Sequence, residues 1–316
     1  MTQLILMILG FVLLIKGSNV LIDGACSIAK KFHIPEIIIG VTIIAIGTSL
    51  PELIISIQAT YNNSDTILIG NIVGSNIANL LLILGTCALI KPLKYTTKAK
   101  YLEIPICIIS TIILIITSNT IISNRVITKE EGIFLIANFL VFILINLVFL
   151  IKNKEKQSNE EIRNDNIFVS VALILIGILS VKIGGDFVVT GTSSIARSFG
   201  ISEKIISMTI VAIGSSLPEL ATSINAIRKN RNNIAIGTII GSNIVNILLI
   251  LGICSVINPI YFSVSYNKDI MLLIMTEILF LSYAFIGEKN TMTRQNGISF
   301  LIMYLIYLIS IVSINR

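Results

Sequence analysis

Long runs of Ile, Leu and Val alternate with short polar connections along the whole chain. A run of about 20 apolar residues can cross the hydrocarbon core of a bilayer as a helix. The pattern therefore predicts an all-α polytopic membrane protein with ten transmembrane helices and no soluble domain. The ten predicted spans are Leu4–Ile22, Ile37–Gln58, Ile67–Ile90, Tyr101–Thr117, Gly132–Ile151, Ile167–Val189, Ile205–Ile227, Ile234–Ile257, Ile270–Ile286 and Ile298–Ile314.

Two of these spans contain nearly the same polar interruption. "AIGTSLPELIISI" begins at Ala45 and "AIGSSLPELATSI" begins at Ala212, an offset of 167 positions. The same offset relates "GNIVGSNIANLLLILG" from Gly70 to "GTIIGSNIVNILLILG" from Gly237. Such self-similarity predicts two internal repeats. We assign residues 1–151 to the first repeat, 152–166 to a polar cytoplasmic linker and 167–316 to the second repeat.

Each repeat holds five predicted spans, and this odd number has a topological consequence. The second repeat must enter the membrane from the opposite side, so the two five-helix repeats are inverted. Inverted repeats recur in secondary transporters, where interrupted helices form a substrate site near the middle of the bilayer.

Composition supports the membrane class and indicates an orientation. Hydrophobic residues make up 54% of the chain and charged residues 13%, and the mean hydropathy is +0.94. With the N-terminus outside, the inner connections carry fifteen Lys and Arg residues and the outer ones six. Because basic residues concentrate on the cytoplasmic side, we expect both termini outside. The net charge of +6 thus reflects orientation, and we expect no nucleic-acid partner.

The interruptions expose backbone groups inside an apolar span. Pro51 has no N–H for the carbonyl of Gly47, and Pro218 has none for Gly214. A carbonyl freed in hydrocarbon needs a partner, which neighbouring side chains or a bound cation can provide.

Glu52 and Glu219 point more directly to ions, because a carboxylate within a bilayer is costly unless it is paired, faces a cavity or titrates. Inversion would bring both near the centre of the membrane. Hydroxyl groups stand four and three residues before each glutamate, on the same helical face if the turn is helical: Thr48 and Ser49, and Ser215 and Ser216. In the next spans Ser and Asn stand four residues apart: Ser75 and Asn79, and Ser242 and Asn246. Such oxygen donors suit Ca²⁺ and Na⁺, although Ser and Asn can also simply join helices.

Two buried negative charges suggest a mechanism. They can be balanced by one Ca²⁺, by two or more Na⁺ or by two protons. If the empty site, with its two negative charges, cannot easily reorient from one side of the membrane to the other, each reorientation must carry one of these sets of cations. The result is exchange. Na⁺/Ca²⁺ antiport, Ca²⁺/H⁺ antiport and a passive cation channel all stay open at this point. An enzyme is not expected, because the chain has no HExxH pair and no nucleophile with a His partner.

The paired GxSLPE and GSNIxN motifs resemble the repeats of the cation/Ca²⁺ exchanger superfamily, specifically its prokaryotic Na⁺/Ca²⁺ exchanger branch. The resemblance covers essentially the whole chain. It implies electrogenic Na⁺/Ca²⁺ exchange at sites between the second, third, seventh and eighth helices. The first and sixth helices, with Gly17 and Gly184, would slide as a gate.

The resemblance also implies individual roles. Glu52 and Glu219 would be shared by Ca²⁺ and Na⁺, and Thr48 and Ser215 would complete the Ca²⁺ site. Na⁺ would be bound by Ser49, Ser75, Ser216 and Ser242 and by the carbonyls of Ala45 and Ala212. Relatives often carry Asp where this chain has Asn246, which removes a negative or protonatable group and puts the stoichiometry in question. We expect a multi-pass plasma-membrane protein that acts as a monomer and needs no cofactor.

Overall fold

The computed structural model is almost entirely helical and describes residues 2–119, 125–152, 166–199, 212–286 and 290–314. In chain order its elements are α1 Thr2–Phe32, α2 Glu36–Ile39, η1 Gly40–Ile44, α3 Ala45–Thr48, α4 Leu50–Tyr61, α5 Asp65–Ala78, η2 Asn79–Leu84, α6 Gly85–Ile90, β1 Leu93–Lys94, η3 Ala99–Glu103, α7 Ile104–Ser118, β2 Val126–Ile127, α8 Lys129–Lys152, α9 Ile167–Ser198, α11 Ala212–Gly214, α12 Leu217–Arg228, α13 Asn232–Ile244, η5 Val245–Ile250, α14 Leu251–Ile257, β3 Ile260–Tyr261, η6 Val264–Tyr266, α15 Asn267–Ile286, β4 Thr291–Met292 and α16 Arg294–Ile314.

The predicted spans correspond to helices long and apolar enough to cross a membrane. Within the described residues eight single helices pass this test, and the bent pair Glu36–Thr48 and Leu50–Tyr61 counts as a ninth span. They match nine of the ten predicted spans. The remaining one, Ile205–Ile227, is described only from Ala212 onward, so the total of ten stays a prediction.

Exposed apolar side chains support the membrane assignment. On α8, Ile133, Leu140 and Leu144 each keep more than half of their surface exposed. Large exposed apolar surface is rare on soluble monomers and marks contact with a membrane or a partner. The predicted all-α polytopic membrane class is therefore confirmed.

Helices and strands follow the sequence repeat. Helix α12 begins and ends 167 residues after α4, and strand β3 follows β1 by the same interval. The wide-turn π-helical segments η2 and η5 also occupy nearly equivalent positions. Where the structure describes both copies, the duplicated sequence thus forms corresponding α-helices and β-strands.

The chain forms two compact units, and each combines segments of both repeats. Unit 1 is Met1–Pro51 with Ile143–Thr238, and unit 2 is Glu52–Phe142 with Ile239–Arg316. The predicted division at residues 152–166 separates the repeats along the sequence, whereas these units are groups of segments in contact.

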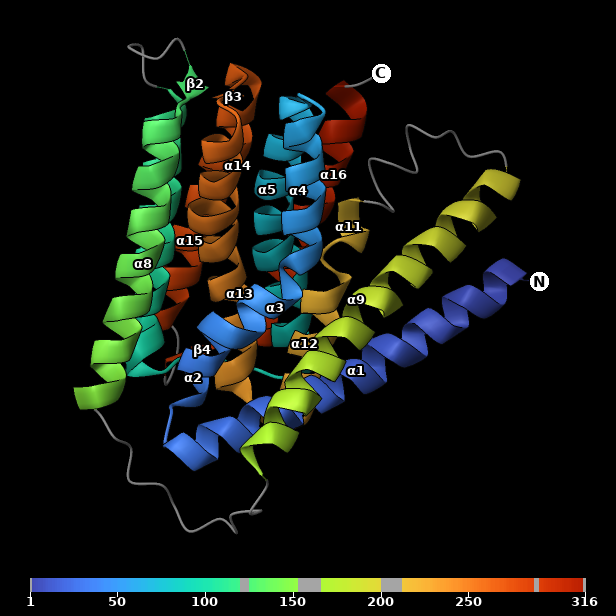
Figure 1. Cartoon of the computed structure of the whole chain (residues 1–316), viewed down its shortest axis with the longest axis vertical. Helices are drawn as coiled ribbons and strands as arrows, with labels where there is room; N and C mark the ends of the chain where they lie inside the picture. The colour runs from blue at the N-terminus through green and yellow to red at the C-terminus, as the bar shows by residue number, and fades with distance from the viewer. Residues whose placement is uncertain (1, 120–124, 153–165, 200–211, 287–289, 315–316) are drawn as a thin grey trace. The chain divides into compact units, whose positions relative to one another are not determined.

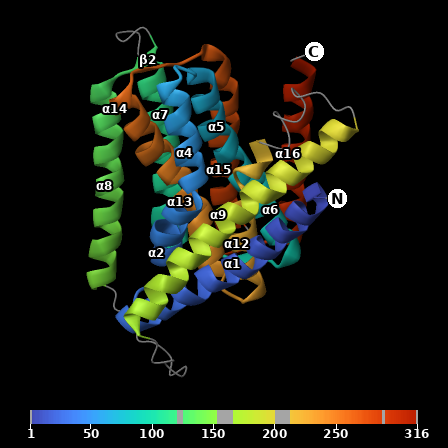
Figure 2. The same ribbon diagram turned by 45° about the vertical axis from the view of Figure 1, so that its right-hand side comes forward.

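In unit 1, α1 and α9 lie side by side along most of their length (Figures 1 and 2). A Cβ atom placed on Gly191 would lie 2.8 Å from the Gln3 carbonyl oxygen, and one on Gly184 would lie 2.8 Å from that of Gly10. A Cβ atom on Gly24 would approach the Ser170 carbonyl to 2.9 Å. As the residue number rises along α1, the number of the contacting residue on α9 falls, so the two helices run antiparallel. Glycine at these positions lets the two backbones approach closely.

In unit 2, each repeat contacts the other through equivalent pairs of elements. Strand β1 pairs with β4 while β2 pairs with β3, both antiparallel. A Cβ atom on Gly85 would lie 3.1 Å from the Gly297 carbonyl oxygen, and one on Gly252 would lie 3.1 Å from that of Gly132. Helices α6 and α14 therefore meet α16 and α8, respectively, in equivalent ways.

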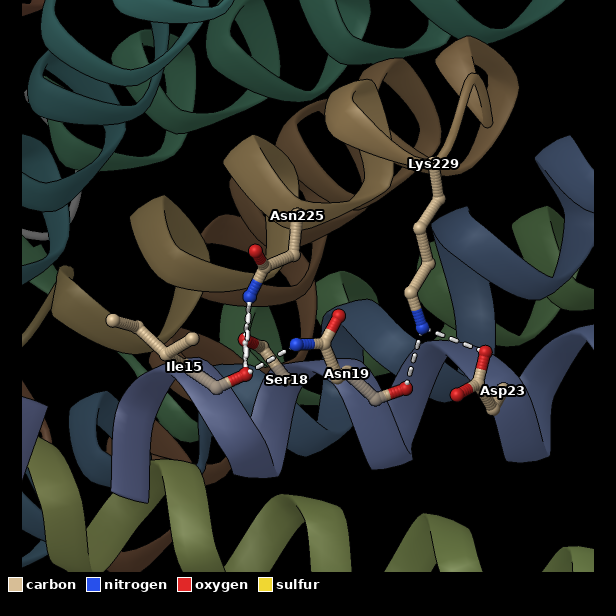
Figure 3. Close-up of polar contacts among 6 residues, drawn as sticks. All are labelled: Ile15, Ser18, Asn19, Asp23, Asn225 and Lys229. Atoms are coloured by element: carbon tan, nitrogen blue, oxygen red, sulfur yellow. Dashed lines mark hydrogen bonds and ion pairs between the residues drawn. The ribbon is translucent and has the colours of Figure 1, made fainter. Parts of the chain in front are cut away.

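Polar contacts join α1 to α12 within unit 1 (Figure 3). The Asn225 amide donates to the Ile15 carbonyl at 3.3 Å and to the Ser18 hydroxyl. One turn further, the Lys229 ammonium donates to the Asn19 carbonyl at 3.1 Å and pairs with Asp23 at 2.6 Å. Asn225 and Ser18 are buried, whereas the Lys229 and Asp23 side chains are 30% and 64% exposed.

This difference in burial predicts unequal effects on stability. Asn225→Ala should lower the free energy of unfolding by about 1–3 kcal/mol, because it removes a buried donor from two acceptors. Lys229→Met should cost less than about 1 kcal/mol, since exposed ion pairs are weak and screened by salt. Thermal unfolding of the purified protein in detergent, at low and high ionic strength, compares the two variants. A larger loss for Lys229→Met would contradict this ranking.

Some predictions fall outside the described residues. They concern most of the linker, the first part of the seventh span at residues 205–211, and several basic residues used for orientation: Lys154, Lys156, Arg163, Lys204, Lys289 and Arg316. The predicted sides of the membrane therefore stay predictions.

Candidate cation site

Both GxSLPE stretches interrupt a helix. Helix α3 ends at Thr48 and α4 begins at Leu50, with a bend of 46° across the pair. Ser49 between them has φ −82° and ψ 9°. In the second repeat α11 ends at Gly214, α12 begins at Leu217, and Ser216 has φ −89° and ψ 4°. The prolines at the second position of α4 and α12 explain the breaks, because proline cannot continue the preceding helical hydrogen bonds.

The breaks change one expectation about helix faces. Thr48 and Ser49 were expected to share a helical face with Glu52, but Ser49 leaves helical geometry before α4 starts. Glu52 and Glu219 instead lie in the first turn of α4 and of α12. A helix N-terminus carries partial positive charge, which favours an ionised carboxylate. Both glutamates are 1% exposed.

In unit 1, the structure brings one residue of each repeat together. The Ser49 hydroxyl donates to Oε1 of Glu219 at 3.3 Å, and both side chains are buried. The two residues are 170 positions apart in the chain. Helix α9 lies beside both breaks: a Cβ atom on Gly47 would meet Ile178, and one on Gly214 would meet Val189.

The remaining unit 1 candidates are also placed close to the breaks. The Thr48 hydroxyl lies 3.1 Å from the Ile44 carbonyl and 3.3 Å from the Ala45 carbonyl, which also accepts from the Ser49 N–H at 3.0 Å. A cation at the Ala45 carbonyl would therefore compete with these donors. Ser215 and Ser216 are buried. Ala212 begins α11.

In unit 2, Glu52 is accompanied by an amide that sequence reasoning missed. The Asn71 amide donates to the Glu52 carbonyl at 3.3 Å and to the Ser56 hydroxyl at 3.1 Å. It therefore ties the first turn of α4 to α5. The repeat offers no signal for Asn71, because Thr238 occupies the equivalent position.

The GSNIxN motifs meet in unit 2. Ser75 and Asn76 lie on α5, and Asn79 begins η2; Ser242 and Asn243 lie on α13, and Asn246 is in η5. All six side chains are buried. The Asn79 amide donates to Asn243 at 3.0 Å, and that of Asn246 donates to Asn76 at 2.9 Å. Asn76 and Asn243 were not predicted, although their identity at the 167-residue offset was a usable signal.

Glu277, another buried carboxylate within a membrane-spanning helix, forms hydrogen bonds between two helices. Its Oε1 accepts from the Thr111 hydroxyl at 2.8 Å and lies 3.3 Å from the Cys107 thiol, so it hydrogen-bonds α15 to α7 in unit 2. Glu277 is 1% exposed, as Glu52 and Glu219 are. It therefore provides a matched control for the two candidate glutamates.

The predicted site residues thus fall into two groups. Unit 1 holds Ala45, Thr48, Ser49, Ala212, Ser215, Ser216 and Glu219, and unit 2 holds Glu52, Ser75, Asn79, Ser242 and Asn246. Each group is rich in buried oxygen donors and comes from both repeats. That one site holds both glutamates stays a prediction.

Comparison with known proteins gives a consistent result over the whole chain. The Sodium/calcium exchanger protein family profile matches residues 2–148 and 169–312. Sodium/calcium exchanger MaX1 of Methanosarcina acetivorans is 30% identical over 96% of this chain and 97% of its own. Inner membrane protein YrbG of Escherichia coli is 32% identical over 87% of this chain and 86% of its own.

Solved structures show the same likeness. The sodium-calcium exchanger NCX_Mj, in a crystal soaked with Na⁺ and Ca²⁺, superposes with a TM-score of 0.83 at 30% identity and covers 98% of both chains. Members of this family are transporters and not enzymes. With the family profile matching nearly all of both repeats, this chain belongs to the sodium/calcium exchanger protein family.

Proposed function

We propose that this protein is a plasma-membrane antiporter that exchanges Na⁺ for Ca²⁺ by alternating access. The Glu52 and Glu219 carboxylates would bind both ions. Thr48 and Ser215 would complete the Ca²⁺ site. Na⁺ would be bound by Ser49, Ser75, Ser216, Ser242 and the carbonyls of Ala45 and Ala212, with the amides Asn79 and Asn246 beside them.

The observation that carries this proposal is the burial of a glutamate immediately after each duplicated break. A carboxylate that is 1% exposed inside a membrane is costly unless it is paired with a positive charge, faces a cavity or titrates. Hydroxyl groups precede each glutamate in the sequence, and the Ser49 hydroxyl donates to Glu219. Carboxylate, hydroxyl and carbonyl oxygens are hard ligands that favour Ca²⁺ and Na⁺ over softer metals.

Charge balance explains why such a site would exchange ions. Two carboxylates can be neutralised by one Ca²⁺ or by at least two Na⁺. An empty site retains both charges, and moving them through a region of low dielectric is unfavourable. Reorientation would then occur mainly in the loaded states, which couples the movement of one ion to the return of the other.

The arrangement of repeats supports alternating access. We propose ten spans in two inverted repeats, with both termini outside the cell and residues 152–166 in the cytoplasm. Antiparallel packing of α1 against its repeat partner α9 is what inversion requires. These helices meet through glycines and lie beside both breaks within unit 1, so sliding of the pair would act directly on the residues around Ser49 and Glu219.

Uptake of ⁴⁵Ca²⁺ into proteoliposomes tests the function. Vesicles loaded with Na⁺ and diluted into Na⁺-free medium should accumulate Ca²⁺, and vesicles with equal Na⁺ on both sides should not. A protonophore that collapses the pH gradient should leave the accumulation intact.

Two other results would contradict the proposal and assign a different function. Accumulation that follows an imposed pH gradient and ignores Na⁺ would assign Ca²⁺/H⁺ antiport. Downhill Ca²⁺ flux without any counter-gradient would assign a passive channel.

A further inference from the structure

Four asparagines form one hydrogen-bond network inside unit 2. Asn76 on α5 donates to the backbone carbonyl of Asn243 at 3.2 Å, and Asn243 on α13 donates to the backbone carbonyl of Asn76 at 3.3 Å. The side-chain oxygen of Asn76 accepts from Asn246, and that of Asn243 accepts from Asn79. All four residues are at most 1% exposed.

The backbone carbonyls determine how every amide in this network is turned. A carbonyl can only accept a hydrogen bond, so the NH₂ groups of Asn76 and Asn243 must face it. Their side-chain oxygens must then face Asn246 and Asn79. These two residues can respond only with their NH₂ groups, since two amide oxygens do not bond to each other. The orientation of Asn79 and Asn246 is therefore imposed by Asn76 and Asn243.

This orientation leaves two oxygens available. The side-chain oxygens of Asn79 and Asn246 are buried and accept no hydrogen bond within the part of the chain that the structure describes. Buried polar atoms are normally satisfied, and a cation is one ligand that satisfies an amide oxygen. Both residues lie in π-helical segments, which frequently occur at functional sites.

We propose that Asn76 and Asn243 are positioning residues, which hold the Asn79 and Asn246 amides with their oxygens turned toward the proposed cation site. This inference rests on the proposed ion-binding function and adds two residues to it. Each of these two positioning residues, called a clamp below, acts across the repeats. Asn76 of the first repeat positions Asn246 of the second, and Asn243 of the second positions Asn79 of the first. Aspartate could not replace either clamp without loss, because an ionised carboxylate has no hydrogen to donate to the carbonyl.

Ca²⁺ binding to the purified protein in Na⁺-free detergent, measured by calorimetric titration, tests the clamp. Asn76→Ala and Asn243→Ala should each raise the Kd for Ca²⁺ by on the order of tenfold, the usual effect of losing a residue that orients a metal ligand. Asn76→Ser has a hydroxyl too short to bridge both partners and should behave alike if the alanine variant does not fold. Thermal unfolding without Ca²⁺ monitors folding separately.

A double-mutant cycle distinguishes positioning from a general structural role. Adding Asn76→Ala to Asn246→Ala should raise the Kd no further, because Asn76 acts through Asn246. The matched cross pair, Asn76→Ala with Asn79→Ala, should show fold-changes that multiply. Multiplication in both pairs, or a Kd within about twofold of wild type in the single clamp variants, would overturn the clamp.

The same measurements keep the clamp and the exchange function apart. If the wild type binds Ca²⁺ but ⁴⁵Ca²⁺ uptake ignores the Na⁺ gradient, Na⁺/Ca²⁺ exchange fails while the Kd values still decide the clamp. If the wild type binds no Ca²⁺, both proposals fail.

Discussion

Glu52→Gln and Glu219→Gln should each abolish Na⁺-driven ⁴⁵Ca²⁺ uptake while leaving the protein folded. Glutamine has nearly the same shape but no charge, so a site with one carboxylate can no longer neutralise Ca²⁺. Leaving a buried charge uncompensated costs roughly 3–5 kcal/mol, which corresponds to a loss of more than about a hundredfold in uptake rate. Initial rates, normalised to the amount of folded reconstituted protein, measure the effect.

Glu277→Gln is the matched control for these variants. Glu277 is as buried as Glu52 and Glu219, but its contacts are to Thr111 and Cys107. A glutamine oxygen can still accept from Thr111, so uptake should stay near the wild-type rate. If all three variants lost uptake equally, the cause would be a general sensitivity to buried carboxyl groups, and the assignment of Glu52 and Glu219 would fail.

Gly184→Ala should destabilise the protein, whereas Gly185→Ala should not. The new Cβ atom at position 184 would lie 2.8 Å from the Gly10 carbonyl oxygen and from the Leu14 amide nitrogen, both backbone atoms of α1. At position 185 the nearest atom would be the Pro218 ring at an ordinary 3.7 Å. Both changes gain the same helix propensity, so the difference isolates the packing of α1 against α9.

Overpacking of this kind typically costs about 1–3 kcal/mol, and thermal unfolding in detergent should show a lower Tm for Gly184→Ala alone. If α1 and α9 slide during transport, the uptake rate of Gly184→Ala should also fall, because the two helix backbones can no longer approach closely. Equal Tm values for the two variants would contradict the close α1–α9 contact.

The sequence alone determined the membrane class and the repeat, and it predicted the chemical character of the candidate site. Apolar runs of spanning length are sufficient because a bilayer-spanning chain must satisfy its backbone locally within a helix. The 167-residue offset was visible because both copies keep nearly the same breaks and the same GSN motif. Glu52 and Glu219 were predicted as site residues because a carboxylate in an apolar span is costly and both recur at the same place in the duplicated breaks.

Only the tertiary structure decided which of these groups meet. Residues 170 positions apart, Ser49 and Glu219, come into contact through the packing of unit 1, and no local pattern encodes such a distance. The same holds for the role of Asn71, which has no equivalent in the second repeat. Asn76 and Asn243 were visible in the motif, but their function depends on hydrogen bonds between α5 and α13. Helix propensity and hydropathy describe each segment by itself, whereas the direction of a side-chain amide is fixed by the partner that folding places beside it.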